Sequence, residues 1–339
     1  MSVIRFSEER LHQVLESFSG KRVAVLGDLM LDRYYWGTVR RISPEAPVPV
    51  VEVDTESVRF GGAANVAQNI RSLGGIPMLV GLIGNDHPGK MFLDMMQEVG
   101  YETDGIVTDA DRQTTIKTRV IAHGQHVVRI DNETRTRCPE HLFHRLIDSI
   151  KYKIHSIDAI LIEDYNKGVV SVEIIREVMA VAGKHGKIVT VDPKFDNFFE
   201  YKGVTVFKPN RREAEEAIGG RIRTVQEVER AGKQLLELLS AENVLLTRGE
   251  EGMSLFERNG GIMHIPTVAD HVQDVSGAGD TVISTLTVAL SAGVPIREAC
   301  VLANCAGGVV VGSVGIVPVS PDDLIKAALR HSNNSPAGD

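Results

Sequence analysis

The sequence has few of the residues that mark several classes of protein. It holds only three cysteines, Cys138, Cys300 and Cys305, with no CxxC pair and no His/Cys ligand spacing. Neither a disulfide framework nor a zinc site is therefore predicted. No run approaches the ~18 consecutive apolar residues of a membrane-spanning helix, and the N-terminal residues MSVIRFSEERLHQ lack an apolar signal core. These absences predict a soluble, cytoplasmic protein with no membrane partner.

Basic residues are fewer than acidic ones. The formal net charge is −8, which argues against nucleic-acid binding but leaves room for a local basic pocket. Aromatic residues make up 5%, and the 32 glycines and 13 prolines are ordinary for a soluble enzyme. Since α/β folds of this length are often one domain, we expect a single domain over residues 1–339.

Apolar strands alternate with amphipathic helices over most of the chain. This alternation predicts an α/β fold, a three-layer α/β/α sandwich with a mainly parallel central sheet. The predicted strands are 22–28, 78–84, 158–164, 187–192, 203–210 and 243–249. The predicted helices are 7–19, 61–75, 88–99, 139–153, 171–184, 211–218, 224–239, 279–292, 296–312 and 321–331.

Two stretches break this alternation. Residues 34–53 and 114–131 have polar residues at alternate positions and no crossover helix of their own, and His123-Gly124 is a hairpin signal within the second stretch. We expect them to form a small sheet that projects from the main layer. The last residues, 332–339, are expected to be a frayed tail.

The stretch DVSGAGDTV, residues 274–282, lies between a strand-like run at 262–265 and a helix-like run. A helix N-terminus presents unpaired N–H groups, and small residues let an anion approach them closely. Gly277, Ala278 and Gly279 could therefore cradle an anion, with Asp280 placed to accept a proton from an attacking hydroxyl. This arrangement suggests phosphoryl transfer to an alcohol. The alternative is an ordinary helix start with an acid near the helix dipole.

A second glycine-rich element, Gly61-Gly62-Ala63-Ala64-Asn65, precedes the first by about 210 residues. Together the two elements resemble the signatures of the ribokinase/phosphofructokinase-B family of sugar kinases. The resemblance implies a ribokinase-like fold, ATP as co-substrate, Asp280 as general base, and an anion hole made by the N–H groups of 277–279. No Walker loop is present, and no GxGxxG follows the first strand, which argues against a Rossmann dehydrogenase.

The resemblance also implies a nucleotide site. Asn210 and Glu213 would hold Mg²⁺ through its waters, with Arg211 and Arg212 between them in the NxxE motif. The alternative for this pair is a helix capping box, and both roles can hold together. The remaining implied nucleotide contacts are Thr247, Arg248, Gly249, Asn304 and Gly308; for the last two, plain helix packing is an equal alternative.

On the sugar side, the resemblance implies that Asp32 binds hydroxyl groups, with Asp28 as a second candidate. Gly61, Gly62 and Asn65 would also contact the sugar. The alternatives are a helix-entry turn for the two glycines and a buried helix polar group for Asn65.

Three stretches, 27–53, 162–171 and 191–195, are similar to the heptose kinases of lipopolysaccharide synthesis. That similarity implies phosphorylation of D-glycero-β-D-manno-heptose 7-phosphate at O1, on the way to ADP-heptose. Since no HxGH nucleotidyltransferase loop occurs near the end of the sequence, a stand-alone kinase is expected. The 7-phosphate needs basic groups, and the candidates are Lys167, Lys194 and Arg129. Arg40, Arg41, Lys117 and Arg119 are expected to be solvated surface charges.

The projecting strands would form a lid over the sugar, and two lids would clasp in a homodimer because exposed strand edges need cover. Whether a monovalent cation binds near 274–279 is left open. Two other functions stay open as well: a different sugar kinase of this family, and a non-catalytic sugar or nucleotide sensor on the same fold.

Overall fold

The main layer of the computed structural model, which describes residues 4–269, 272–313 and 315–334, is a nine-stranded sheet. Its order is β13-β12-β11-β10-β9-β8-β1-β4-β5. The bounds are β1 Arg22–Gly27, β4 Ile76–Gly84, β5 Ile106–Asp109, β8 Ala159–Glu163, β9 Ile188–Asp192, β10 Val206–Phe207, β11 Asn243–Thr247, β12 Met253–Glu257 and β13 Ile262–Ile265. The pairings from β5 to β11 are parallel and those of β12 and β13 are antiparallel, so the predicted mainly parallel sheet is confirmed.

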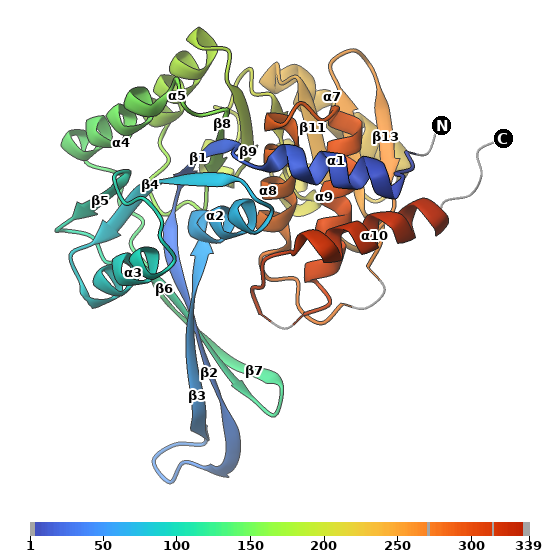
Figure 1. Ribbon diagram of the computed structural model, residues 1–339. Helices are drawn as coiled ribbons and strands as arrows, with labels where there is room; N and C mark the ends of the chain where they lie inside the picture. Colours follow the sequence, from blue (N-terminus) through green and yellow to red (C-terminus); the bar gives the residue numbers. More distant parts are fainter. Residues whose placement is uncertain (1–3, 270–271, 314, 335–339) are drawn as a thin grey trace.

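Helices cover both faces of this sheet (Figure 1). A separate buried apolar cluster lies between the sheet and the helices of each face. One face carries α1 Glu8–Phe18, α2 Ala63–Ser72, α3 His87–Glu98, α8 Ala278–Ser291, α9 Ile296–Val310 and α10 Pro321–Asn334. The other face carries α4 Glu140–Lys153, α5 Val172–Lys184, α6 Arg211–Ile218 and α7 Val225–Leu239. Two single 3₁₀ turns occur at Phe195–Asn197 and Gly249–Glu251. This is the predicted three-layer sandwich.

Helix α8 runs through the middle of its layer, which matters for the site. Every residue from Asp280 to Ala289 is buried, because the helix packs against α2, α9 and the sheet. The buried hydroxyl groups of Ser284, Thr285 and Thr287 donate to carbonyls one turn earlier in the helix, so they are satisfied within it. Among the described residues, no helix is both long enough and apolar enough to cross a membrane.

A second sheet projects from the main body (Figure 1). Its order is β3-β2-β6-β7, with bounds β2 Leu29–Ile42, β3 Pro49–Gly62, β6 Thr115–Ala122 and β7 Gln125–Asn132. The hairpin prediction is confirmed, since His123 (φ 52°) and Gly124 (φ 75°) both have the left-handed backbone of a two-residue turn. We call β2, β3, β6 and β7 the projecting sheet.

Three boundaries differ from prediction. Strands β2 and β3 extend well beyond 34–53, because their roots are buried on both faces and so lose the alternating pattern. Strand β10 is only two residues long, since Pro209 closely follows it and offers no N–H. Helix α10 continues to Asn334, so 332–334 are helical rather than frayed, and the rest of the predicted tail lies outside the described residues.

Candidate active site

Polar side chains gather where neighbouring parallel strands end. Asp28 follows β1, Glu163 ends β8 and Asp192 ends β9, and these three strands are adjacent in the sheet although far apart in sequence. All three side chains are buried. Helix α8 packs against these strands. Open α/β sheets bind their ligands at the carboxyl ends of the strands.

Asp280, in the first turn of α8, lies at the centre of this region. Its side chain is 3% exposed, and each carboxylate oxygen accepts one hydrogen bond. Asn65 Nδ2 donates to Oδ2 at 2.7 Å, and the Tyr165 hydroxyl donates to Oδ1 at 2.8 Å. Burial raises the pKa of Asp280 from 3.8 to about 6, against the opposing effect of the Asn65 bond. The carboxylate is therefore fixed in orientation and suited to accept a proton near neutral pH.

Two further acids surround this carboxylate. Oxygen atoms of Glu163, Asp192 and Asp280 all lie within 4.8 Å of one another. Lys208 Nζ pairs with Asp192 at 2.8 Å and supplies a buried positive charge. Burial, together with the neighbouring charges of Asp192 and Asp280, raises the pKa of Glu163 well above its ordinary value. Glu163 therefore holds a proton more tightly than an ordinary carboxyl group.

The glycines of GAGD have different geometric roles. Gly277 caps α8 with φ 77°, and a Cβ there would lie 2.9 Å from Asn65 Nδ2. Gly279 faces Asp192 and Lys208, and a Cβ there would make ordinary contact with both, at 3.5 Å from Asp192 Oδ2 and from Lys208 Nζ. The first N–H groups of a helix have no acceptor within the helix. The Ala278 N–H, a predicted anion donor, bonds the Val275 carbonyl at 3.3 Å, so it is less free than predicted.

Asp28, a predicted sugar contact, is hydrogen-bonded to the protein's own backbone. Its carboxylate accepts the backbone N–H groups of Tyr165, Lys167 and Val169 at 2.7, 3.0 and 3.2 Å. Both oxygens are thus used to hold the loop that follows β8. Burial and the nearby Asp164 raise the pKa of Asp28 to about 6. Burying this carboxylate costs free energy, and its three hydrogen bonds offset that cost. We assign Asp28 to the loop.

Asp32 lies on β2, in the buried part of the projecting sheet. It is 2% exposed and forms an ion pair with Arg119 on the neighbouring strand. A Cβ at Gly61 would lie 2.1 Å from Asp32 Oδ2, so glycine is required there to accommodate the acid. The expectation that Arg119 is a solvated charge is wrong, since its side chain is only 11% exposed.

Lys117 also points inward, against prediction. It lies on β6 in register with Asp32 on β2, and its Nζ is 5.1 Å from the centroid of the Tyr165 ring. Burial lowers its pKa, and the nearby charge of Asp32 opposes that change. Strand alternation places Lys117 and Arg119 on the same face of the projecting sheet, so both side chains lie near Asp32.

The three basic residues predicted for a sugar phosphate are in different places. Lys167 Nζ pairs with Glu133 at 2.8 Å and is close enough to affect Lys117. Lys194 pairs with Glu213, and its Nζ is 5.3 Å from the centroid of the Tyr165 ring that Lys117 also approaches. Arg129 is 59% exposed on β7 and pairs with Asp131. Lys167 and Lys194 therefore both lie within the site, whereas Arg129 is exposed to solvent.

Comparison with known proteins identifies the family. The model for "pfkB family carbohydrate kinase" matches residues 21–323. The chain belongs to the pfkB family of carbohydrate kinases.

Relatives and solved structures agree with this assignment. The chain is 45% identical over 311 residues to the bifunctional protein HldE of Pelobacter propionicus, covering 91% of this chain and 64% of the relative. It is 46% identical over 301 residues to HldE of Geobacter sulfurreducens, covering 89% and 61%. The chain thus spans less than two thirds of the length of either relative.

Two solved kinases share the fold. Escherichia coli phosphofructokinase-2 in complex with potassium has a TM-score of 0.76 at 18% identity, covering 93% of this chain and 99% of that one. Arabidopsis thaliana ribokinase with ribose and ATP has a TM-score of 0.71 at 19% identity, covering 91% and 99%. The ribokinase-like fold expected from the sequence is therefore confirmed.

The NxxE motif of this pfkB kinase forms a capping box at the start of α6. Asn210 Oδ1 accepts the Glu213 N–H at 2.9 Å, and Glu213 Oε2 accepts the Asn210 N–H at 2.8 Å. The other Glu213 oxygen meets Lys194. These oxygen atoms keep lone pairs that suit the waters of Mg²⁺, whereas direct coordination at Glu213 Oε1 would displace Lys194. The donor set therefore fits an ion held through its waters.

The other predicted nucleotide contacts form two groups. Arg211 and Arg248 both pair with Glu251 and brace the turn at 249–251, in which Gly249 has φ 61°. Thr247 ends β11 beside Asn210, with which it forms an isolated parallel bridge. Arg212 is different, because it is exposed on the outer side of α6.

Asn304 and Gly308, on α9, support the segment 266–269. Asn304 Nδ2 donates to the Pro266 carbonyl at 2.8 Å, and a Cβ at Gly308 would meet Val268 Cγ2 at 2.6 Å. The structure therefore favours the packing alternative for both residues.

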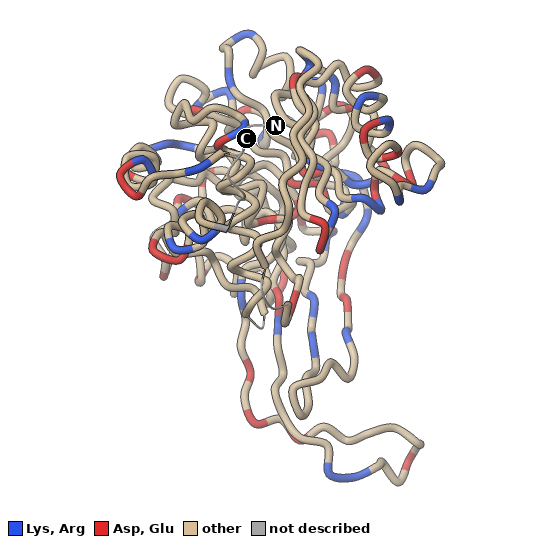
Figure 2. The backbone as a smooth tube through the Cα atoms, turned by 90° about the vertical axis from the view of Figure 1, so that its right-hand side faces the viewer, with Lys and Arg blue, Asp and Glu red and all other residues tan. Residues whose placement is uncertain are grey.

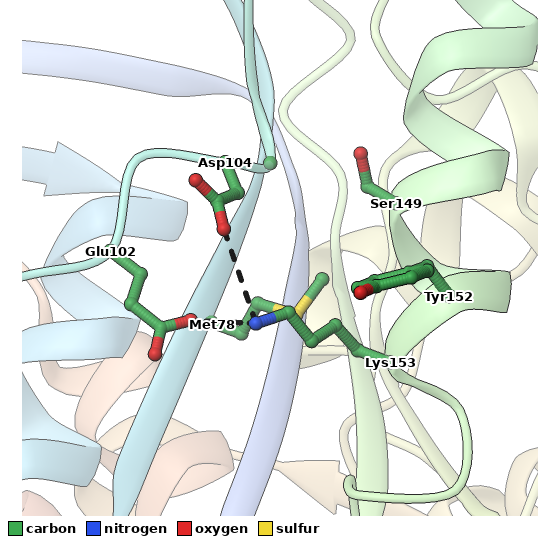
Figure 3. A pocket seen from close by; sticks show the side chains of 7 residues that line it. Met78, Glu102, Asp104, Ser149, Tyr152 and Lys153 are labelled. Carbon is green, nitrogen blue, oxygen red and sulfur yellow. Dashed lines mark hydrogen bonds and ion pairs between the residues drawn. The ribbon is translucent and has the colours of Figure 1, made fainter.

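A hollow of about 200 Å³ between β4, the loop before β5 and α4 lies apart from this site (Figure 3). Its lining residues are Met78, Glu102, Asp104, Gly105, Ser149, Tyr152 and Lys153. Lys153 Nζ lies between the carboxylates of Glu102 and Asp104, at 3.3 and 4.0 Å. The charges of the hollow thus compensate one another, and we assign it no part in the kinase reaction.

The sequence patterns missed three residues of the site. Tyr165, Glu163 and Lys208 carry no motif, and each is placed by a strand end. All three lie at the end of a strand or within two residues of it, as Asp28 and Asp192 do.

Proposed function

We propose that this kinase transfers the γ-phosphoryl group of ATP to O1 of D-glycero-β-D-manno-heptose 7-phosphate, with Asp280 as the general base. The observation that carries the proposal is the Asp280 carboxylate. It is buried in the first turn of α8, held by Asn65 and Tyr165, and has a pKa of about 6. A buried acid with one donor on each oxygen is far better suited to proton transfer than to a mere helix cap.

In the proposed step, Asp280 accepts the proton of the sugar O1 hydroxyl as its oxygen attacks the γ-phosphorus. A new O–P bond forms, the bond from phosphorus to the β,γ-bridging oxygen breaks, and ADP leaves. The unpaired N–H groups at the start of α8 would stabilise charge on the transferred group. Gly279 has no side chain between the helix start and Lys208, so the transferred group could approach both.

Mg²⁺ would be held through its waters by Asn210 and Glu213, and it would neutralise charge on the ATP phosphates. Lys194, beside Glu213, would then face the same phosphates. Burial opposes its charged form, but Asp192 and Glu213 outweigh that effect and raise its pKa, so it stays a cation. The monovalent cation near 274–279 and the cytoplasmic location stay predictions.

A phosphorylated heptose is supported by the similarity to the two HldE proteins and by the cations around Asp32. Asp32 offers hydroxyl acceptors, and Lys117, Arg119 and Lys167 gather near it. Such a cluster suits a sugar that also carries an anion. We therefore propose Lys167 and Lys117 for the 7-phosphate, and we move Lys194 from the sugar to the nucleotide side.

The deciding experiment is product analysis with ATP and Mg²⁺ on a panel of ribose, fructose 6-phosphate and D-glycero-D-manno-heptose 7-phosphate. We expect only the last to give a bisphosphate, and Asp280→Asn to lower its rate by ~10²–10⁴ while the fold is kept. Lys167→Ala should raise KM for the heptose phosphate, and Lys194→Ala should raise KM for ATP. Equal turnover of an unphosphorylated sugar would refute the substrate assignment, and full activity of Asp280→Asn would refute the base.

A homodimer through the projecting sheet is proposed as well. Exposed apolar side chains concentrate on this sheet, among them Val53 (52%), Val128 (48%) and Ile130 (57%). Charges of both signs lie along the same strands (Figure 2). Since an unpaired sheet with apolar side chains needs cover, a second copy is the natural partner. Light scattering should give a dimer for the native chain and a monomer for Ile130→Asp; a monomeric native chain would refute the proposal.

A further inference from the structure

Tyr165 links the proposed base to two lysines on different elements. Its hydroxyl donates to Asp280 Oδ1 at 2.8 Å. Lys117 Nζ, from the projecting sheet, and Lys194 Nζ, from the loop after β9, lie 5.1 and 5.3 Å from its ring centroid. Ammonium groups within ~6 Å of an aromatic ring are attracted to its electron-rich face. Tyr165 therefore contacts the proposed base, a lysine of the projecting sheet and a lysine of the loop after β9.

The loop that carries Tyr165 is held from several directions. Asp28 accepts three of its backbone N–H groups, including that of Tyr165 itself. The buried Arg112 donates to the Lys167 carbonyl at 2.7 Å, and Asp164 accepts the Tyr201 hydroxyl at 2.6 Å. The position of the Tyr165 hydroxyl is therefore set by the protein before any substrate binds.

The hydroxyl contact leaves the base able to react. With Asn65 on Oδ2 and Tyr165 on Oδ1, each Asp280 oxygen has one fixed donor and a lone pair to spare. A substrate hydroxyl can donate to a remaining lone pair without displacing either partner. Two fixed donors also prevent the carboxylate from rotating away.

We propose that Tyr165 is a positioning residue of this kinase: its hydroxyl orients the Asp280 carboxylate for proton abstraction, and its ring holds Lys117 and Lys194 at the reacting centre. This inference rests on the proposed role of Asp280 as base. It separates two functions within one side chain, because the hydroxyl acts on the proton transfer and the ring acts on the binding of the two phosphorylated substrates.

The hydroxyl should also influence the titration of Asp280. The groups that face this carboxylate are Asn65 from α2, Glu163 and Tyr165 from β8 and its loop, Asp192 from β9 and Lys208 after β10. Burial and Asp192 favour protonation, whereas Lys208 and the two donors favour the charged form. Removal of the phenol hydroxyl should therefore move the protonation of Asp280 to higher pH.

The test compares Tyr165→Phe, which keeps the ring, with Tyr165→Leu, which removes it. We expect Tyr165→Phe to lower kcat about tenfold or more, as for the loss of a hydrogen bond to a charged group, with both KM values nearly unchanged. The acid limb of its kcat/KM profile should move to higher pH. Tyr165→Leu should in addition raise KM for ATP and for the sugar phosphate. Tyr152→Phe, whose side chain is 83% exposed, is the matched control and should behave as the native protein.

A second readout does not depend on the substrate. In protein with ¹³C-carboxyl aspartate, the resonance that is absent from Asp280→Asn reports the titration of Asp280, and its midpoint should rise in Tyr165→Phe. An unchanged midpoint with native kcat in folded Tyr165→Phe overturns the inference. If instead Asp280→Asn retains full activity, the base assignment fails on its own, and the resonance still shows whether Tyr165 orients this carboxylate.

Discussion

Replacing Asp280 by Asn should stabilise the protein at neutral pH, because burial of the ionised carboxylate opposes folding. The pKa of Asp280 is raised from 3.8 to about 6, chiefly by burial. A group whose pKa is raised on folding contributes stability in full below its unfolded pKa and loses it as pH rises through the folded pKa. The difference between 3.8 and about 6 corresponds to ~3 kcal/mol of stability lost above pH 7.

The amide can replace the carboxylate without leaving a buried group unpaired. Its oxygen can accept from Asn65, and its N–H can donate to the Tyr165 hydroxyl, which rotates to accept. The variant then lacks the ionisation that destabilises the native protein. The raised pKa of Asp28 is present in both proteins and cancels in the difference.

The assay is reversible urea unfolding of the native protein and Asp280→Asn, followed by circular dichroism at several pH values. We expect the variant's advantage to grow by ~1.4 kcal/mol between pH 5 and pH 8, about half of the total shift, since the rest is lost below pH 5. Asp148→Asn, at an exposed position on α4, should show the same dependence of unfolding free energy on pH as the native protein. The same dependence in Asp280→Asn would refute the claim that burial of this carboxylate opposes folding.

Three further substitutions test the geometry of the site. Asp28→Ala should lower the unfolding free energy by ~3 kcal/mol, since three buried N–H groups lose their acceptor; native urea stability with a raised sugar KM would return this residue to sugar binding. Gly277→Ala, at φ 77° and 2.9 Å from Asn65, should cost ~1–2 kcal/mol in the same assay and lower kcat; a fully native variant would contradict the required left-handed turn. Gly61→Ala should displace Asp32, with an added Cβ only 2.1 Å from its oxygen, and raise KM for the sugar phosphate in steady-state kinetics; an unchanged KM would mean that Asp32 does not bind the sugar.

Much of the fold could be predicted because the apolar pattern of each element is local. Strands such as β8 and β9 are short, continuous apolar runs, and their fully or nearly fully buried patterns agree with that signal. The roots of β2 and β3 gave no alternation, because tertiary packing buries both of their faces. Strand β12 was not predicted as a separate element, since its pairings with β11 and β13 distinguish it from a loop.

The candidate site was predictable only where backbone geometry requires particular residues. Gly277 and the capping box of Asn210 and Glu213 are such cases, since turn and cap chemistry restrict the residue type. Tyr165 could not be predicted, because its role depends on the adjacency of β8 to elements more than a hundred residues away in the sequence. Arg119 was assigned wrongly, and the loop contacts of Asp28 were missed, for the same reason, since their partners come from other strands and loops.

The acids at the strand ends have two different functions, and their partners tell them apart. Asp28 and Asp164 accept bonds from their own surroundings, namely backbone N–H groups and the side chains of Tyr201 and Asn197, so their charge is used to hold the loop. Asp280 also has two donors, but it lies in the first turn of α8 beside Lys208, where we propose that it meets the reacting hydroxyl. Burial raises the pKa of both Asp28 and Asp280 to about 6, yet the first acid holds a loop and the second is the proposed base. Since the loop held by Asp28 carries Tyr165 to Asp280, Asp28 would act on the proposed base through a single hydroxyl group.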